Sequence, residues 1–99
     1  MKELIFEKCT GFDWDLGKQD KNREKHGVSH QECEEVFFNE LLLIYEDIKH
    51  SHIEERLYLL GQTDEGRRLF LAFTIRKMLF RVISARDMSK KEHTIYDQI

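Results

Sequence analysis

The chain has 99 residues with a formal net charge of −3, 35% charged residues and 11% aromatic residues, a composition that excludes a disordered chain and a uniformly basic nucleic-acid binder. A chain of this length builds one core, so residues 1–99 are expected to form a single domain. No apolar run reaches the roughly 18 residues of a membrane-spanning helix, and the first residues lack the pattern of a signal peptide, so we expect a cytoplasmic protein with no membrane partner.

The N-terminal part predicts a short strand and a polar helix. Residues 1–11 contain a brief apolar stretch that ends in glycine, which is typical of an N-terminal extension or an edge strand. An acidic start near Asp13 and a glycine at position 27 predict a helix over residues 16–26, because glycine favours the left-handed conformation that follows many helices.

The clearest start of a helix lies at Ser29. Ser29 and Glu32 have the spacing of a capping box, and Val28 and Cys33 have the spacing of a hydrophobic staple. We therefore predict a second helix that begins after Ser29 and ends near Asn39.

The rest of the chain predicts a sheet. Four segments rich in branched and aromatic residues are expected to be strands: 41–48, 56–61, 68–75 and 79–86. Short links between consecutive strands favour an antiparallel meander. If Arg76 and Lys77 form the last two-residue turn, Phe73 faces Phe80 and Arg67 lies opposite Arg86.

Another capping box, Ser89 with Glu92, predicts a short C-terminal helix. The predicted fold class is therefore α+β, with a compact antiparallel β-sheet flanked by two N-terminal helices and a short C-terminal helix.

Basic residues concentrate in the predicted sheet. Between Gly66 and Lys91 the chain has eight Lys or Arg against one acid, and between Glu32 and Glu55 it has eight acids against one lysine. This asymmetry predicts a local anion site, with phosphate as the usual ligand. Guanidinium groups hold phosphate with a bidentate fork and stabilise its transition-state charge. The candidates are Arg56, Arg67, Arg76, Arg81 and Arg86; the alternative is that they are solvated strand residues paired with acids.

Three side chains are candidates for proton transfer. Lys25, His26 or Glu55 could move protons while the 2′-hydroxyl of RNA attacks its own phosphate, a reaction that needs no metal. Alternatively, Lys25 and His26 interact with a helix dipole and Glu55 forms a salt bridge. A loop metal site at His50 and His52 lacks a matching fourth ligand, so we expect no metal and no cofactor.

Two separated motifs resemble the BrnT family of toxins. The first starts at Phe12 and reads F-D-W-D-x-x-K-x-x-x-N-x-x-K-H-G-V-S. The second half adds matching positions in the same order: Glu55-Arg56, Gly61, Gly66-Arg67, Thr74-x-Arg76, Arg81 to Arg86, Glu92 and Tyr96. The resemblance covers about residues 12–96. The family commonly has glycine where Lys77 stands.

The resemblance implies a RelE-like fold and a ribonuclease toxin of a bacterial type II toxin-antitoxin pair. It implies RNA as substrate and, as partner, a BrnA-like ribbon-helix-helix antitoxin through which DNA is bound only indirectly. The RNA-facing residues that it carries over are Lys25, His26, Arg56, Arg67, Arg76, Arg81 and Arg86. The alternative is a non-catalytic partner-binding subunit of a toxin-antitoxin-type repressor complex.

Overall fold

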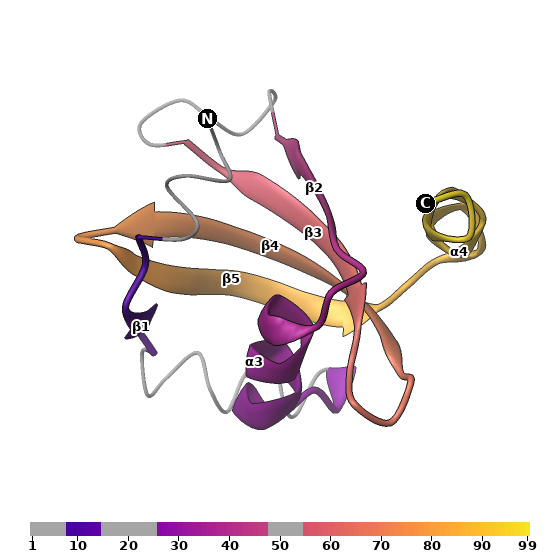
Figure 1. The fold of residues 1–99 in the computed structure, drawn as a ribbon, viewed down its shortest axis with the longest axis horizontal. Coiled ribbons are helices and arrows are strands. Elements are labelled where there is room, and N and C mark those ends of the chain that lie inside the picture. The colour runs from indigo at the N-terminus through magenta and orange to yellow at the C-terminus, as the bar shows by residue number, and fades with distance from the viewer. Residues whose placement is uncertain (1–7, 15–25, 48–54) are drawn as a thin grey trace.

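The computed structural model contains a five-stranded sheet with two helices (Figure 1), and it describes residues 8–14, 26–47 and 55–99. The elements, in chain order, are β1 (Gly11–Phe12), α3 (His30–Phe38), β2 (Leu43–Glu46), β3 (Leu57–Gln62), β4 (Arg68–Arg76), β5 (Leu79–Asp87) and α4 (Lys90–Tyr96). The strand order is β1-β5-β4-β3-β2. In the described part of the chain, no helix is long and apolar enough to span a membrane.

The sheet is mixed, so the prediction of a purely antiparallel sheet is wrong in one strand. Strands β2 to β5 form the expected antiparallel meander, but β1 pairs with β5 in parallel. Backbone hydrogen bonds from Thr10 N to Met78 O (2.9 Å) and from Asp13 N to Phe80 O (2.8 Å) fix this pairing. A strand of two residues is too short to show a period-2 pattern in the sequence.

Helix α3 begins and ends where its capping residues predict. The Ser29 hydroxyl accepts a hydrogen bond from Glu32 N at 3.1 Å, and the Glu32 carboxylate accepts one from Ser29 N at 3.1 Å. Val28 and Cys33 are both buried, as the staple predicts, and Gly27 has the left-handed φ of 64°. The predicted helix over 16–26 lies outside the described residues except for His26, which is helical.

Helix α4 is also confirmed by its capping box. The Ser89 hydroxyl accepts from Glu92 N at 3.2 Å, and the Glu92 carboxylate accepts from Ser89 N at 2.9 Å. The buried Tyr96 donates its hydroxyl proton to Leu41 O at 2.7 Å, which ties α4 to the segment before β2.

The predicted register of the last hairpin is wrong. Lys77 and Met78 are the two turn residues, with φ values of 51° and 63°. Two consecutive left-handed residues form the primed turn whose twist matches that of the strands. With this turn, Phe73 faces Val82 instead of Phe80.

A bulge shifts the register further along the same pair of strands. The irregularity lies between Ala72 and Phe73, and beyond it Arg86 lies opposite Phe70 and not opposite Arg67. The bulge places Ile83 among the side chains of the sheet face that α4 covers, as an additional residue of β5.

The two faces of the sheet are packed differently. One face packs against α3 through buried side chains that include Cys33, Val36 and Phe37 of the helix and Leu59, Leu71 and Phe73 of the sheet. On the other face, a smaller cluster forms beneath α4: Leu60, Phe70, Ala72, Met88 and Tyr96. Figure 1 shows α3 lying against the sheet and α4 beyond the ends of the strands. Part of the second face is therefore not covered by either of these helices.

Candidate phosphate site on the sheet

A row of polar side chains crosses β3, β4 and β5 on the face opposite α3. Thr74 is paired with Arg81 on β5, and its hydroxyl donates to Glu55 O at 2.6 Å. Arg56 directly precedes β3, and its carbonyl oxygen accepts from Asp47 N at 2.8 Å. Because side chains alternate along a strand, Arg56 lies on the same face as Thr74 and Arg81. Thr74 thus lies between two arginines.

Arg86 occupies the same face, opposite Phe70, which lies four residues before Thr74 on β4 and nearer to α4. Its guanidinium carbon lies 4.1 Å from the centre of the Phe70 ring. It donates to both carboxylate oxygens of Glu92, at 2.8 and 2.9 Å, and to Asp87 O at 3.1 Å. These bonds use three of the five N–H donors that a guanidinium has. Burial would raise the pKa of Glu92, but the hydrogen bonds from Arg86 and Ser89 lower it below its usual value.

Carboxylates also hold the two arginines of the row. Arg81 Nη1 lies 3.1 Å from the Asp13 carboxylate, and Arg56 Nε lies 3.6 Å from Asp47, whose side chain is 3% exposed. A phosphate at this site would bind beside these carboxylates. Arg76 is exposed at the end of β4 and, by alternation, lies on the face of Thr74.

Two tyrosines belong to this face, although the sequence reasoning did not single them out. Tyr45 and Tyr58 are cross-strand partners with ring centres 5.2 Å apart. A hydrogen bond with Asp47 raises the pKa of the Tyr58 phenol. The available signal in the sequence was the period-2 pattern of the short strand that contains Leu43 and Tyr45. This pattern shows that the two side chains share a face, but it does not tell whether that face is packed in the core or open to a ligand.

Arg67 lies on the other side of the sheet, where it holds the start of α3. Its Nε and Nη2 donate to Asp87 at 2.7 and 3.1 Å, and its Nη1 donates to Glu32 at 3.1 Å. The carbonyl oxygens of Gly27 and His26 accept from the same guanidinium at 2.8 and 3.2 Å. All five donors are therefore bound by protein acceptors. The structure does not bring Arg67 together with Arg86, Arg81 and Arg56.

The three candidates for proton transfer are not gathered in one place. The His26 backbone is bound by Arg67 on the α3 side, and the His26 charge helps the Arg67 hydrogen bonds to lower the pKa of Asp87. Glu55 is exposed and adjoins the row through its carbonyl oxygen. Lys25 lies outside the described residues, as do His50 and His52. The described residues contain no group of three or more His, Cys, Asp or Glu side chains that fits a metal ion.

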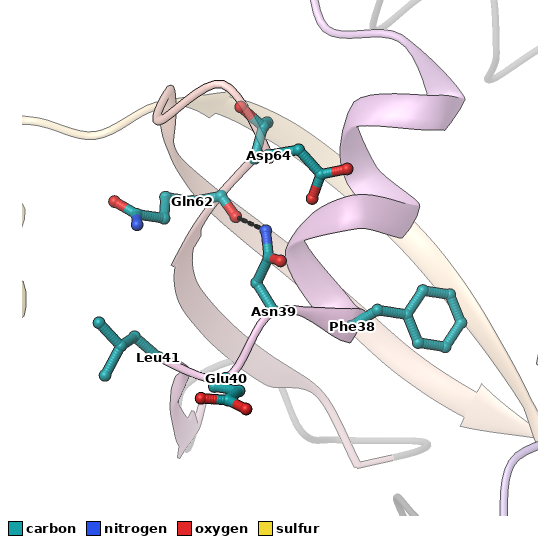
Figure 2. Close-up of a pocket in the computed structure, with 7 residues that line it drawn as sticks. Phe38, Asn39, Glu40, Leu41, Gln62 and Asp64 are labelled. Atoms are coloured by element: carbon teal, nitrogen blue, oxygen red, sulfur yellow. Dashed lines mark hydrogen bonds between the residues drawn. The ribbon is translucent and has the colours of Figure 1, made fainter.

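A surface pocket of about 560 Å³ lies elsewhere, after the end of α3 (Figure 2). Its lining consists of Phe38, Asn39, Glu40, Leu41, Gln62, Thr63 and Asp64. Asn39 Nδ2 donates to Gln62 O at 2.6 Å across it. Two carboxylates and no lysine or arginine face this pocket, so it does not suit a phosphate.

Comparison with known proteins identifies one family. The sequence profile described as "Ribonuclease toxin, BrnT, of type II toxin-antitoxin system" matches residues 14–92. A search of curated proteins finds no match. Among solved structures, the crystal structure of the Brucella abortus ribonuclease toxin BrnT is similar, with a TM-score of 0.63 and 21% sequence identity over 82% of this chain and 99% of that chain. At this identity, the structural likeness shows a shared fold.

Proposed function

The chain belongs to the BrnT family of ribonuclease toxins of type II toxin-antitoxin systems, and on that premise we propose that it is an endoribonuclease toxin that cleaves RNA without a metal ion. The observation that carries this proposal is the common location of Arg56, Arg81 and Arg86 on one sheet face. The RelE-like class of the fold and a cytoplasmic location are part of the same proposal.

The reaction needs only groups of the substrate and the protein. The 2′-hydroxyl oxygen attacks the adjacent phosphorus, the bond from phosphorus to the 5′-oxygen breaks, and the products are a 2′,3′-cyclic phosphate and a 5′-hydroxyl. One group removes the proton of the 2′-hydroxyl, and another protonates the leaving oxygen. Glu55 adjoins the row, so we assign it the first role. His26 lies with Arg67 on the α3 side of the sheet, away from the row, so we assign it no role in this reaction. Lys25 stays a candidate for the second role.

The arginines stabilise the extra negative charge of the pentacoordinate phosphorus. Arg81 and Arg56 flank Thr74, and Arg76 extends the basic face beyond them. Arg86 is a further phosphate ligand of the group, and a phosphate that binds its fork replaces Glu92, which occupies Nη1 and Nη2 at 2.8 and 2.9 Å. Arg67 takes the structural role that its bonds to Asp87 and Glu32 indicate.

The test is cleavage of RNA by the purified protein in the presence of a chelator. We expect wild-type protein to cleave, Arg86→Ala and Arg81→Ala to lose cleavage, and Arg68→Ala to retain it. Arg68 is a matched control because it lies on the same face but is held at α4, paired with Asp97 at 2.6 Å and 5.1 Å from the centre of the Tyr96 ring. RNA that stays intact at high protein concentration would contradict the activity.

The proposed partner is an antitoxin, of the BrnA type with a ribbon-helix-helix element that binds DNA. A second function is a non-catalytic subunit of such a complex, in which the basic face binds an acidic segment of the partner. The pairing of Arg81 with Asp13 and of Arg86 with Glu92 favours it, because those arginines already bind carboxylates. Expression in bacteria separates the two: the toxin arrests growth, and the subunit does not.

A further inference from the structure

Aromatic rings form a continuous series across the proposed RNA face. The ring centres of Tyr45 and Tyr58 are 5.2 Å apart, those of Tyr58 and Phe70 are 4.9 Å apart, and the Arg86 guanidinium lies 4.1 Å above the Phe70 ring. The series runs from the edge strand β2 to the arginine of β5. Aromatic surface and positive charge are therefore continuous on this face.

The members of this series differ in exposure. Phe70 is 8% exposed and belongs to the cluster beneath α4, whereas Tyr45 is 36% exposed on β2. Tyr58 is half-buried, so Tyr45 is the ring of the series that offers the largest surface to a ligand. A ring that is supported from one side by a second aromatic ring is held in place, so a ligand that stacks on it orders little additional structure.

The position of Tyr45 relative to the arginines fits a nucleotide. The Arg86 guanidinium lies over β4, two strands away from Tyr45, which corresponds to about 10 Å at the usual spacing between strands. The charges of Glu92, Arg86 and Asp47 all act on the Tyr45 phenol, so the ring lies within the electrostatic field of the proposed site. A nucleotide segment whose phosphate contacts Arg86 can place a base on Tyr45.

We propose that Tyr45 is a base-stacking subsite, which receives an unpaired nucleobase next to the phosphate held by Arg86 and so selects single-stranded RNA. This inference rests on the proposed function. Every base has an aromatic face, so the subsite favours an unpaired strand over a duplex without reading a particular base. In a duplex the bases remain stacked on their neighbours and cannot reach the ring.

Binding of an uncleavable oligonucleotide tests the subsite separately from catalysis. The probes are a single-stranded RNA with 2′-O-methyl groups, an abasic strand of the same length, and the duplex form of the RNA. We expect Tyr45→Ala to weaken binding of the single strand about 5- to 100-fold and to leave binding of the abasic strand unchanged. Tyr45→Phe should bind as the wild type does, because stacking needs the ring and not the hydroxyl.

Two controls make the outcomes distinguishable. Phe38→Ala removes another exposed aromatic side chain, 75% exposed at the end of α3, and should not change binding. Arg86→Ala should weaken binding of both the RNA and the abasic strand. Two results would contradict the stacking subsite and leave the phosphate site unaffected: Tyr45→Ala binds the RNA as the wild type does, or its affinity for the RNA and for the abasic strand falls by the same factor. If wild-type protein binds neither strand, both the subsite and the proposed function fail.

Discussion

Arg86 of β5 and Glu92 of α4 form a two-point ion pair, with Nη1 to Oε1 at 2.8 Å and Nη2 to Oε2 at 2.9 Å. The same carboxylate accepts a hydrogen bond from Ser89 N and so caps α4. One side chain therefore starts the C-terminal helix and occupies the fork of the arginine that we propose for phosphate binding. A carboxylate and a phosphate present similar pairs of oxygens to a guanidinium, so the two compete for Arg86.

Replacement of Glu92 by glutamine should strengthen RNA binding. Glutamine keeps the capping box, but it removes the charge that competes with phosphate. We expect roughly 3- to 10-fold tighter binding at low salt, and a loss of less than about 1 kcal/mol in the free energy of unfolding. Asp97→Asn is the control, because it removes the same charge from α4 at the Arg68 pair. An equal gain in both variants would show that only net charge matters.

Arg67 should contribute to stability and not to RNA binding. Arg67→Ala leaves Asp87 and Glu32 without their cation, and two carbonyl oxygens without a donor. We expect a loss of about 2 kcal/mol in the free energy of unfolding, measured by urea denaturation. Arg67→Lys should recover only part of it, because lysine lacks the planar fork. Stability equal to that of the wild type would contradict the assigned role.

The same clamp predicts a dependence of stability on acid pH. Hydrogen bonds from Arg67 lower the pKa of Asp87 although burial opposes this, and for Glu32 the effect of burial is outweighed by hydrogen bonds from Ser29 and Arg67. Groups whose pKa is lower in the folded state contribute stability above their unfolded pKa and lose it as the pH falls through the folded value. We expect the free energy of unfolding to fall with pH in that range for the wild type, and to fall less for Arg67→Ala. Arg68→Ala should keep the wild-type slope.

The helix boundaries could be predicted from the sequence because their signals are local. Each capping box, Ser29 with Glu32 and Ser89 with Glu92, lies within four consecutive residues and marks the start of a helix. Both capping boxes are present in the structure. The register of the last hairpin could not, since it depends on a turn whose residues, Lys77 and Met78, are unusual for left-handed backbone.

The shared face of the arginines could not be predicted for a related reason. Five residues separate Arg81 from Arg86, so alternation alone would place them on opposite faces of β5, and the bulge between Ala72 and Phe73 brings both to the face of Thr74 and Phe70. Arg67 lies on the opposite face of the sheet. There its guanidinium binds Gly27 O and Glu32 at the start of α3, two acceptors that are distant from it in the sequence. Which carboxylate pairs with each arginine is likewise a property of the tertiary structure.

The hairpin turn can be improved by substitution. Side chains with a Cβ at positive φ are strained, and Asn-Gly is the preferred sequence of this turn. We expect the double substitution Lys77→Asn and Met78→Gly to raise the free energy of unfolding by about 1 kcal/mol, measured by urea denaturation. Arg76→Ala, next to the turn, serves as a control that changes no left-handed residue. A decrease in stability would contradict the assignment of Lys77 and Met78 as the turn.

Gly61 should be intolerant of any larger residue because α3 packs directly on it. A Cβ at this position would lie 2.7 Å from Val36 Cγ1 and 2.9 Å from Leu42 Cδ2, and both distances are too short for carbon atoms in contact. Val36 is fully buried, so it has little room to move. We expect Gly61→Ala to lower the free energy of unfolding by about 1–3 kcal/mol.

The double variant Gly61→Ala with Val36→Ala tests the reason for this loss. Val36→Ala alone should destabilise because it leaves a cavity beneath α3. In the Gly61→Ala background, Val36→Ala removes the methyl group that the new Cβ would clash with. It should therefore lower the free energy of unfolding by less than it does in the wild-type background, or not at all. A double-mutant cycle measured by urea denaturation gives the coupling directly. Additive losses would show that α3 does not approach β3 at Gly61 as closely as the structure has it.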